Sequence, residues 1–297
     1  GGMVVLAAKT ASDLASTVVN NSGIIQAQSV GIKNGVIRLE GGSQLSGAGT
    51  ANSPVGAGDA IPSSIGDTAV SPVGAGNTPS NGITLVSGTL DVSGRKAGET
   101  GGTVKVLGDK VGLMTGSFVD ASGDAGGGEV LVGGNYQGKG SEHNAAFTYM
   151  APNSKVIADA VSTGTGGKAI LWADDTTRAY GSISVRGGSQ AGDGGLAEVS
   201  GKRNLVFEAD VDRRAENGQA GMLLLDPTNL TIVAGSSSTN VTGGTPFEPA
   251  TASGSTLGWT NINAALGGGA VTIQTVKPVG GGNVKHHPAG GHLLDNC

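Results

Sequence analysis

Paired aspartates are the residues of this 297-residue sequence that come nearest to a catalytic pattern. Asp174 and Asp175 are adjacent, and Asp159 and Asp210 could stack near them if neighbouring segments of the chain lie on one another. Glycoside hydrolysis needs two carboxylates roughly 5 to 10 Å apart. No histidine-containing or Arg-x-Lys phrase accompanies these aspartates, and His143 is the only histidine outside the C-terminal segment. We therefore expect Asp174 and Asp175 to solvate a turn, and we predict no catalytic residue.

Ligands for a metal ion or a cofactor are equally sparse. Asp124 and Asp193 lie in glycine-rich turns, but neither fits the Gly-Gly-x-Gly-x-Asp calcium repeat. Residues 164–168 resemble a phosphate loop, yet Ser162 stands where its first glycine belongs and Ala169 replaces the hydroxyl residue. We predict no metal ion and no cofactor.

The C-terminal segment, residues 277–297, differs in texture from the rest of the chain. His286, His287, His292 and Cys297 could bind zinc in principle, but they lack the ordered spacing of zinc sites. Cys297 is the only cysteine, so no internal disulfide can form. We interpret residues 277–297 as a flexible or non-native tail.

Four aromatic residues and three glycosylation triplets are the remaining candidate features. Aromatic rings stack on sugars when they are exposed, although Trp172 could equally cap the interior of the fold. The Asn-x-Ser/Thr triplets arise often by chance and carry little weight. The aromatic candidates are Trp172, Tyr136, Tyr149 and Tyr180, and the triplets begin at Asn20, Asn229 and Asn240.

The composition limits the elements that could position such residues. The chain has 56 glycines, 10 scattered prolines, 37% apolar residues, 14% charged residues and a net charge of −5. Collagen needs glycine at every third position with abundant proline, and disorder needs low hydrophobicity with high charge. A nucleic-acid surface needs clustered lysine and arginine, but here the 18 basic residues are spread thinly. We predict a folded chain without a nucleic-acid partner.

Glycine pairs mark a loose repeat. Each pair opens a short segment in which apolar and other residues alternate, and a second alternating segment follows after a polar interval. This predicts two short strands per repeat. The first segments are 101–107, 127–132, 166–172 and 194–199, and the second segments are 117–121, 155–160, 182–186 and 204–209.

Alternation with a period of two indicates strands with one buried face, and a repeat of roughly 20 to 40 residues that cannot bury this face alone implies a solenoid. We predict an all-β fold, a parallel β-helix over residues 1–233. It would have about eight to ten coils and form a rod on the order of 40 to 50 Å long. The residues expected to point inward include Val104, Val106, Ile170, Ile183, Val185 and Leu223.

Two segments interrupt the repeat. Residues 43–80 are rich in glycine, serine and proline and contain the same hexapeptide at 53–58 and 71–76. We interpret them as a loop extruded from one corner of the solenoid; the alternative is a disordered linker between two domains. Residues 234–276 are expected to continue the β-helix or to form a linker with a short helix near 260–266 and a strand near 270–274.

Several phrases resemble the filamentous haemagglutinin-like exoproteins of two-partner secretion. The most specific is the Leu-Leu-Leu-Asp-Pro phrase within residues 221–232; the others are residues 2–9, 18–27, 167–174 and 180–188. The resemblance covers roughly residues 1–276 and implies a right-handed parallel β-helix. The signal peptide and the Asn-Pro-Asn-Gly motifs of that family's amino-terminal secretion domain are missing. We therefore expect an internal fragment of a longer protein.

The resemblance implies a non-enzymatic adhesin or fibre segment, secreted or on the bacterial cell surface. Its implied partners are surface glycans or proteins of a host or the environment, and the outer-membrane transporter that would recognise the missing domain. End-to-end self-association is also open to such a chain, because an uncapped solenoid end is a template for strand addition. The alternative is a carbohydrate-active β-helix that binds or cleaves polysaccharide.

Overall fold

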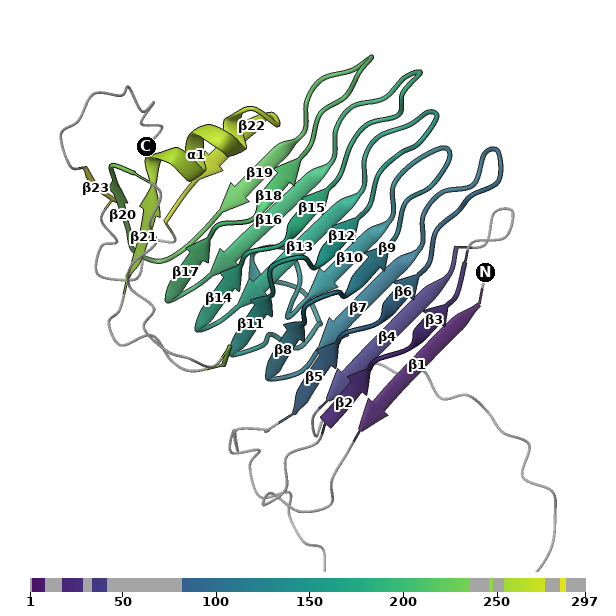
Figure 1. The fold of residues 1–297 in the computed structure, drawn as a ribbon, viewed down its shortest axis with the longest axis horizontal. Coiled ribbons are helices and arrows are strands. Elements are labelled where there is room, and N and C mark those ends of the chain that lie inside the picture. The colour runs from purple at the N-terminus through teal and green to yellow at the C-terminus, as the bar shows by residue number, and fades with distance from the viewer. Residues whose placement is uncertain are drawn as a thin grey trace, which may run out of the picture.

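The glycine-led alternating segments form strands of long parallel sheets. A computed structural model describes residues 2–8, 18–28, 34–41, 82–235, 246–247, 254–275 and 284–286. In Figure 1 the strands lie side by side in a stack that runs from the purple N-terminal strands to the green and yellow C-terminal ones. The fold is therefore mostly β, as predicted.

Three parallel sheets make up this stack. Sheet A has eight strands, namely β1 (Met3–Ala8), β4 (Val36–Gly41), β7 (Thr103–Leu107), β10 (Glu129–Val132), β13 (Lys168–Ala173), β16 (Leu196–Gly201), β19 (Met222–Leu225) and β22 (Ala270–Ile273). Sheet B has six, namely β2 (Val18–Asn21), β5 (Ile83–Val86), β8 (Lys110–Leu113), β11 (Phe147–Met150), β14 (Thr176–Ala179) and β17 (Asn204–Phe207). Sheet C also has six, namely β3 (Ile24–Gln26), β6 (Thr89–Asp91), β9 (Phe118–Asp120), β12 (Lys155–Ile157), β15 (Ser182–Ser184) and β18 (Asp210–Asp212).

From β1 to β19, successive strands belong to sheets A, B and C in turn, and each return to sheet A places the new strand beside the previous strand of that sheet. This arrangement is compatible with a β-helix or β-solenoid. Each coil carries three strands, not the predicted two. Up to Val233 the described part of the chain supplies seven strands to sheet A, fewer than the predicted eight to ten coils. At the usual spacing of about 4.8 Å, all eight strands of sheet A span roughly 34 Å.

Buried threonines explain why β11 and β14 of sheet B were not predicted from the sequence, whereas β17 was predicted, within residues 204–209. The inward positions of β5, β11 and β14 hold Thr84, Thr148 and Thr177, which are fully or almost fully buried. Their Oγ1 hydroxyls donate to the carbonyl oxygens of Leu107, Trp172 and Ser200 at 2.6, 2.6 and 2.7 Å. A buried hydroxyl with a partner carries little penalty. These strands therefore lack the apolar alternation that marks sheets A and C.

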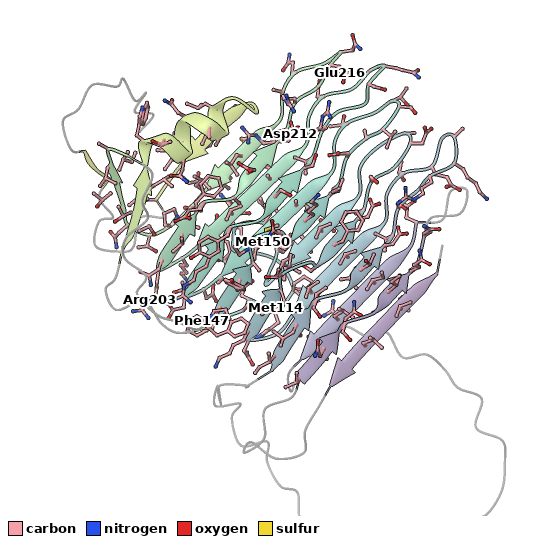
Figure 2. The ribbon with its side chains drawn as sticks, viewed as in Figure 1. Met114, Phe147, Met150, Arg203, Asp212 and Glu216 are labelled. Carbon is pink, nitrogen blue, oxygen red and sulfur yellow. The ribbon has the colours of Figure 1, made fainter. Side chains whose placement is uncertain are left out.

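The interior holds five of the six residues predicted to point inward: Val104, Val106, Ile183, Val185 and Leu223 are buried in the main core. Ile170 is buried too, but on the opposite face of sheet A. Its neighbours along β13, Ala169 and Leu171, face the main core instead. Figure 2 shows Met150 of β11 inside the stack, with Arg203 and Phe147 near its edge.

The glycine pairs allow the coils to approach closely at one corner. A Cβ added to Gly128 would lie 2.1 Å from the Gly102 carbonyl oxygen, and one on Gly167 would lie 2.1 Å from the Gly128 oxygen. The same carbonyls accept the N–H groups of Glu129 and Lys168 at 2.9 Å. Glycine is therefore required here because the backbones are close, and not because of a positive φ.

A smaller sheet and a helix end the stack. β20 (Leu230–Val233) lies between β21 (Ser255–Gly258) and β23 (Val284–His286), and α1 (Trp259–Leu266) contacts β18. The helix and β22 lie where a short helix and a strand were predicted. Of the predicted tail, 277–297, only β23 is within the described residues. No helix in the described part of the chain is long and apolar enough to cross a membrane.

The predicted insertion, residues 43–80, lies outside the described residues, so its structure is left open. The strands on either side of it, β4 and β5, belong to the same stack. The Gly41 N–H donates to Thr84 Oγ1 at 2.9 Å, so the two flanking strands adjoin at one corner.

Candidate functional site

A loop between β10 and β11, residues 133–146, lies over the outer face of sheet A. It carries the 3-10 helix η1 (Tyr136–Gly138). Glu142 in this loop pairs with Arg38 Nη1 at 2.8 Å and with Lys105 Nζ at 2.6 Å, from β4 and β7. These hydrogen bonds and charges lower the pKa of Glu142 against the opposing effect of its burial. Ion pairs to two strands thus attach the loop to the sheet.

His143 adds a further contact from the loop to the corner before β8. Its Nε2 lies 2.8 Å from Asp109 Oδ1, and this hydrogen bond raises the pKa of the imidazole. Among the described residues, Asp109 is the carboxylate that contacts the imidazole ring. His143 therefore attaches the loop to this corner and does not bridge two carboxylates.

Trp172 lies beneath this loop. Its side chain is only 3% exposed and packs with Leu131, Ile170 and Tyr136 on the outer face of sheet A. A Cβ added to Gly138 would lie 2.4 to 2.7 Å from three indole atoms, so this glycine lies directly on the ring. Trp172 therefore neither caps the interior of the coils nor presents an open ring. It forms a second, external core with the loop.

A cavity of about 440 Å³ opens beside Trp172. Its lining comes from three parts of the structure. The loop 133–146 supplies Asn144, and the segment after β22 supplies Gln274. Three stacked corners supply Asp174, Lys202 and Asp226. Trp172 Nε1 donates to Asp174 Oδ1 at 3.1 Å, and Gln274 Nε2 donates to Asp226 Oδ2 at 2.9 Å. The cavity therefore holds two carboxylates, amides and ammonium groups around one edge of an indole. We take it as the candidate functional site.

A buried carboxyl group adjoins this cavity. Glu198 on β16 is fully buried, and the backbone N–H of Gln137, which lines the cavity, donates to its Oε2 at 2.9 Å. Burial raises the pKa of Glu198 to about 7, and the charge of Asp226 adds to this effect. The Gln137 N–H, the Ser200 hydroxyl and the charge of Lys168 act in the opposite direction. Glu198 is therefore a titratable group beneath the covering loop.

The aspartates expected to gather near Asp174 lie elsewhere. Asp175 accepts from Arg203 Nη1 and Thr176 Oγ1, both at 2.9 Å. Asp159 follows β12 at a different corner, and Asp210 begins β18. The grouping considered from the sequence is therefore not formed.

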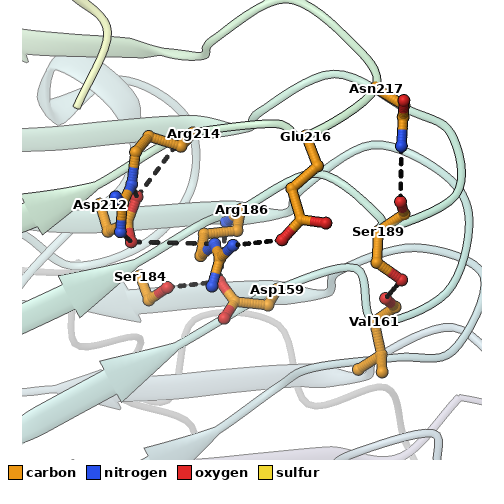
Figure 3. Close-up of polar contacts among 9 residues, drawn as sticks. All are labelled: Asp159, Val161, Ser184, Arg186, Ser189, Asp212, Arg214, Glu216 and Asn217. Atoms are coloured by element: carbon orange, nitrogen blue, oxygen red, sulfur yellow. Dashed lines mark hydrogen bonds and ion pairs between the residues drawn. The ribbon is translucent and has the colours of Figure 1, made fainter.

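Asp159 belongs instead to a corner cluster around Arg186 (Figure 3). Its Oδ1 accepts from Ser184 Oγ at 2.6 Å and from the Arg186 N–H at 2.7 Å. The Arg186 guanidinium lies 3.2 Å from Glu216 and 3.8 Å from Asp212. A small cavity of about 220 Å³ adjoins this cluster. Because arginine groups pair with its carboxylates, the cluster holds the corner turns together.

Asp124 and Asp193, the aspartates of the glycine-rich turns, form hydrogen bonds that stabilise neighbouring turns. Asp124 accepts from the Gly98 N–H at 2.7 Å and from Ser162 Oγ at 2.5 Å, and the pKa of its carboxyl group is lowered, mainly by the Ser162 hydroxyl. Asp193 accepts from the Gln219 N–H at 2.8 Å. Within the described ranges, no three His, Cys, Asp or Glu side chains are grouped to hold a metal ion. His287, His292 and Cys297 lie outside those ranges.

Other sequence candidates have ordinary structural settings. The loop that resembled a phosphate site, 164–168, ends in the glycine corner, and Lys168 forms an ion pair with Glu129. Tyr149 and Tyr180 are half-buried, and their rings meet edge to face with centroids 6.0 Å apart. Asn20 lies in β2 and Asn229 directly precedes β20, while Asn240 lies outside the described residues.

A shallow groove of about 850 Å³ follows the glycine corner along the stack. Its floor is the backbone of the glycine pairs, and its rim includes Thr103, Glu129, Leu196 and Met222 at the starts of sheet A strands. The N–H groups of these four residues bond to the preceding coil. These N–H groups are therefore not available to a ligand in the groove.

Sequence reasoning singled out Trp172 and Asp174 but missed Glu198, Asn144 and Asp226 as parts of one site. Asp226 had a signal, because it lies in the Leu-Leu-Leu-Asp-Pro phrase. Glu198 interrupts a position that is apolar in the two preceding coils, where its register partners Ile170 and then Leu131 stand. The loop 133–146, which covers Glu198 and donates the Gln137 N–H to it, comes from another coil.

No protein-family model matches this chain, and a search of curated proteins gives no match. The resemblance to haemagglutinin-like exoproteins is therefore a hypothesis that rests on the sequence phrases alone.

Proposed function

We propose that this chain is a non-enzymatic structural segment of a secreted or cell-surface adhesin or fibre. The observation that carries the proposal is the unbroken register of the three parallel sheets, with glycine corners stacked coil on coil. Such a stack is extended in one direction and grows by adding coils, which suits a rigid spacer or display rod. We further propose the right-handed β-helix of the haemagglutinin-like family, because parallel crossover connections are right-handed in about 98% of cases.

Attachment would use surface glycans or proteins of a host or the environment, and export would use a two-partner secretion transporter. End-to-end association is supported by the first coil. In the part of the chain that the structure describes, β1, β2 and β3 each pair on one side only. Met3 is 73% exposed, and Val5 and Ile24 are also exposed on these strands. An open strand edge with exposed apolar residues is a template for another strand, from a second copy of this chain or from a preceding coil of a longer one.

Electron microscopy of the purified chain over a range of concentrations tests this proposal. We expect short rods that join end to end as concentration rises, and fewer joined rods for the double variant Val5→Lys, Ile24→Lys. Val161→Lys is the matched control, because Val161 is an exposed apolar residue on a corner and not on the open edge. Compact round particles, or joining that is equally reduced by the control, would contradict the proposal.

A second candidate function, binding or cleavage of polysaccharide, is favoured by the cavity beside Trp172, because two carboxylates, Asp174 and Asp226, belong to its lining. A panel of polysaccharides incubated with the parent chain, Asp174→Ala and Asp226→Ala separates the two candidates. Release of reducing ends by the parent, lost in both variants, would make this second function correct and the non-enzymatic proposal wrong.

A further inference from the structure

The cavity beside Trp172 is balanced in charge. The carboxylates of Asp174 and Asp226 and the ammonium groups of Lys139 and Lys202 all belong to its lining. A free anion would meet the two carboxylates and a free cation would meet the two ammonium groups. A neutral ligand that can both donate and accept hydrogen bonds avoids either conflict.

The polar groups of the cavity require both donors and acceptors from a ligand. Asn144 Oδ1 is buried without a hydrogen-bond partner among the described residues, whereas its Nδ2 donates to the Gly138 carbonyl oxygen at 2.8 Å. The exposed Asp174 carboxylate accepts from Trp172 Nε1 and can accept further bonds, since a carboxylate offers about four lone-pair sites. The Lys202 ammonium can donate. A ligand with at least two hydroxyl groups fits all three, because each hydroxyl donates one bond, to Asn144 Oδ1 or to the Asp174 carboxylate, and can also accept from Lys202.

The size and rigidity of the cavity limit the range of possible ligands further. A volume of about 440 Å³ lies within the range of small-molecule sites, roughly 300 to 1,000 Å³. Three lining residues come from corners of the parallel stack, and the covering loop is attached by the ion pairs of Glu142. A preformed site loses less entropy on binding than a mobile one. Trp172 also lines the cavity, but because it is 3% exposed it offers a ligand only a narrow strip of its indole edge.

We propose that this cavity binds one neutral sugar unit of a surface glycan through its hydroxyl groups, without cleaving it. The inference rests on the proposed attachment function and names its ligand class. A pyranose ring combines vicinal hydroxyls with apolar C–H faces, which matches carboxylate, amide and indole in one small cavity.

Calorimetric titration tests the proposal with neutral probes, namely glucose, galactose, N-acetylglucosamine, lactose and cellobiose, and with glucuronate as the anionic comparison. We expect the parent to bind at least one neutral probe. Asp174→Asn should weaken that binding about tenfold or more, because a charge-assisted acceptor becomes a neutral amide. Asp175→Asn is the matched control, since the neighbouring Asp175 bonds to Arg203 and Thr176 away from the cavity. It should change the affinity by less than about twofold.

Three results would overturn the inference: a folded parent that binds none of the neutral probes, equal weakening by both aspartate variants, or tighter binding of glucuronate than of every neutral sugar. The rods seen by microscopy form a separate readout. Rods without sugar binding would refute this inference alone, while sugar binding by compact particles would refute the proposed rod and leave the site intact.

Discussion

Glu198 should make the stability of this protein fall as pH rises through 7, and a single substitution should remove this contribution to the pH dependence. The carboxyl group is fully buried, and burial raises its pKa from an ordinary 4.5 to about 7. Because the folded state holds the proton more tightly than the unfolded state, neutral Glu198 is the favoured folded form. The stability that protonated Glu198 contributes to the folded state is fully present below pH 4.5 and is lost as pH rises through 7. A shift of this size corresponds to about 3 kcal/mol, at 1.36 kcal/mol per pKa unit.

Glu198→Gln removes the titration and keeps an acceptor for the Gln137 N–H. Urea unfolding at pH 4 should give nearly equal free energies of unfolding for the parent and this variant. At pH 8 the variant should be more stable, by up to about 3 kcal/mol. Glu216→Gln is the control, because Glu216 is 59% exposed on a corner loop and its change should stay within about 0.5 kcal/mol. An equal effect of Glu198→Gln at both pH values, or a variant less stable than the parent at pH 8, would refute the reasoning.

The strands of sheet A from β7 to β19 could be predicted because their coils repeat the same close approach. Only glycine fits where the Gly167 backbone meets the Gly128 carbonyl oxygen, and the strand begins directly afterwards. This requirement leaves a visible mark, a glycine pair followed by alternation. Some strands of sheet B carry no such mark, since buried threonines such as Thr148 satisfy their hydroxyls on neighbouring carbonyls. Polar residues at inward positions concealed β11 and β14, whereas β17, with Leu205 and Phe207 inward, was predicted within residues 204–209.

Alternation also cannot tell which of two buried faces is the interior. Ile170 and Leu171 are both buried, yet Leu171 faces the coil interior and Ile170 faces the loop 133–146. The length of that loop is readable from the sequence, but its place over sheet A depends on Glu142 meeting Arg38 and Lys105 from two other coils. Contacts of this range leave no local pattern.

The candidate site could not be predicted from the sequence because its residues are also brought together by long-range contacts. Asp174, Lys202 and Asp226 are 24 to 52 residues apart in the printed sequence and meet only because successive corners stack. Asn144 joins them from the covering loop. Their spacing follows the length of each coil, which varies along the chain. A fixed motif could therefore not have identified the cavity.

The stack itself can be tested at three further positions. Ile183→Asp would place a charge in the dry interior of sheet C, and urea unfolding should show a loss of at least about 3 kcal/mol; unchanged stability would mean that the strand face is reversed. Gly167→Ala should lower the melting temperature while Gly23→Ala should not, because a Cβ meets a carbonyl oxygen at 2.1 Å in the first case and open space in the second; equal effects would contradict the close-approach explanation. Arg213 is fully buried and donates to the carbonyl oxygens of Val211 at 3.1 Å and Ala265 at 2.8 Å. The Ala265 oxygen belongs to the last turn of α1, where a cation also favours the helix dipole. Arg213→Met should therefore loosen the helix selectively, since it removes the guanidinium from that carbonyl, which keeps only backbone N–H donors such as that of Gly268 at 3.1 Å, while keeping an unbranched side chain. Hydrogen exchange should then show protection falling in α1 and staying high in β13 and β16, and undiminished protection of α1 would show that the guanidinium does not hold the helix in place.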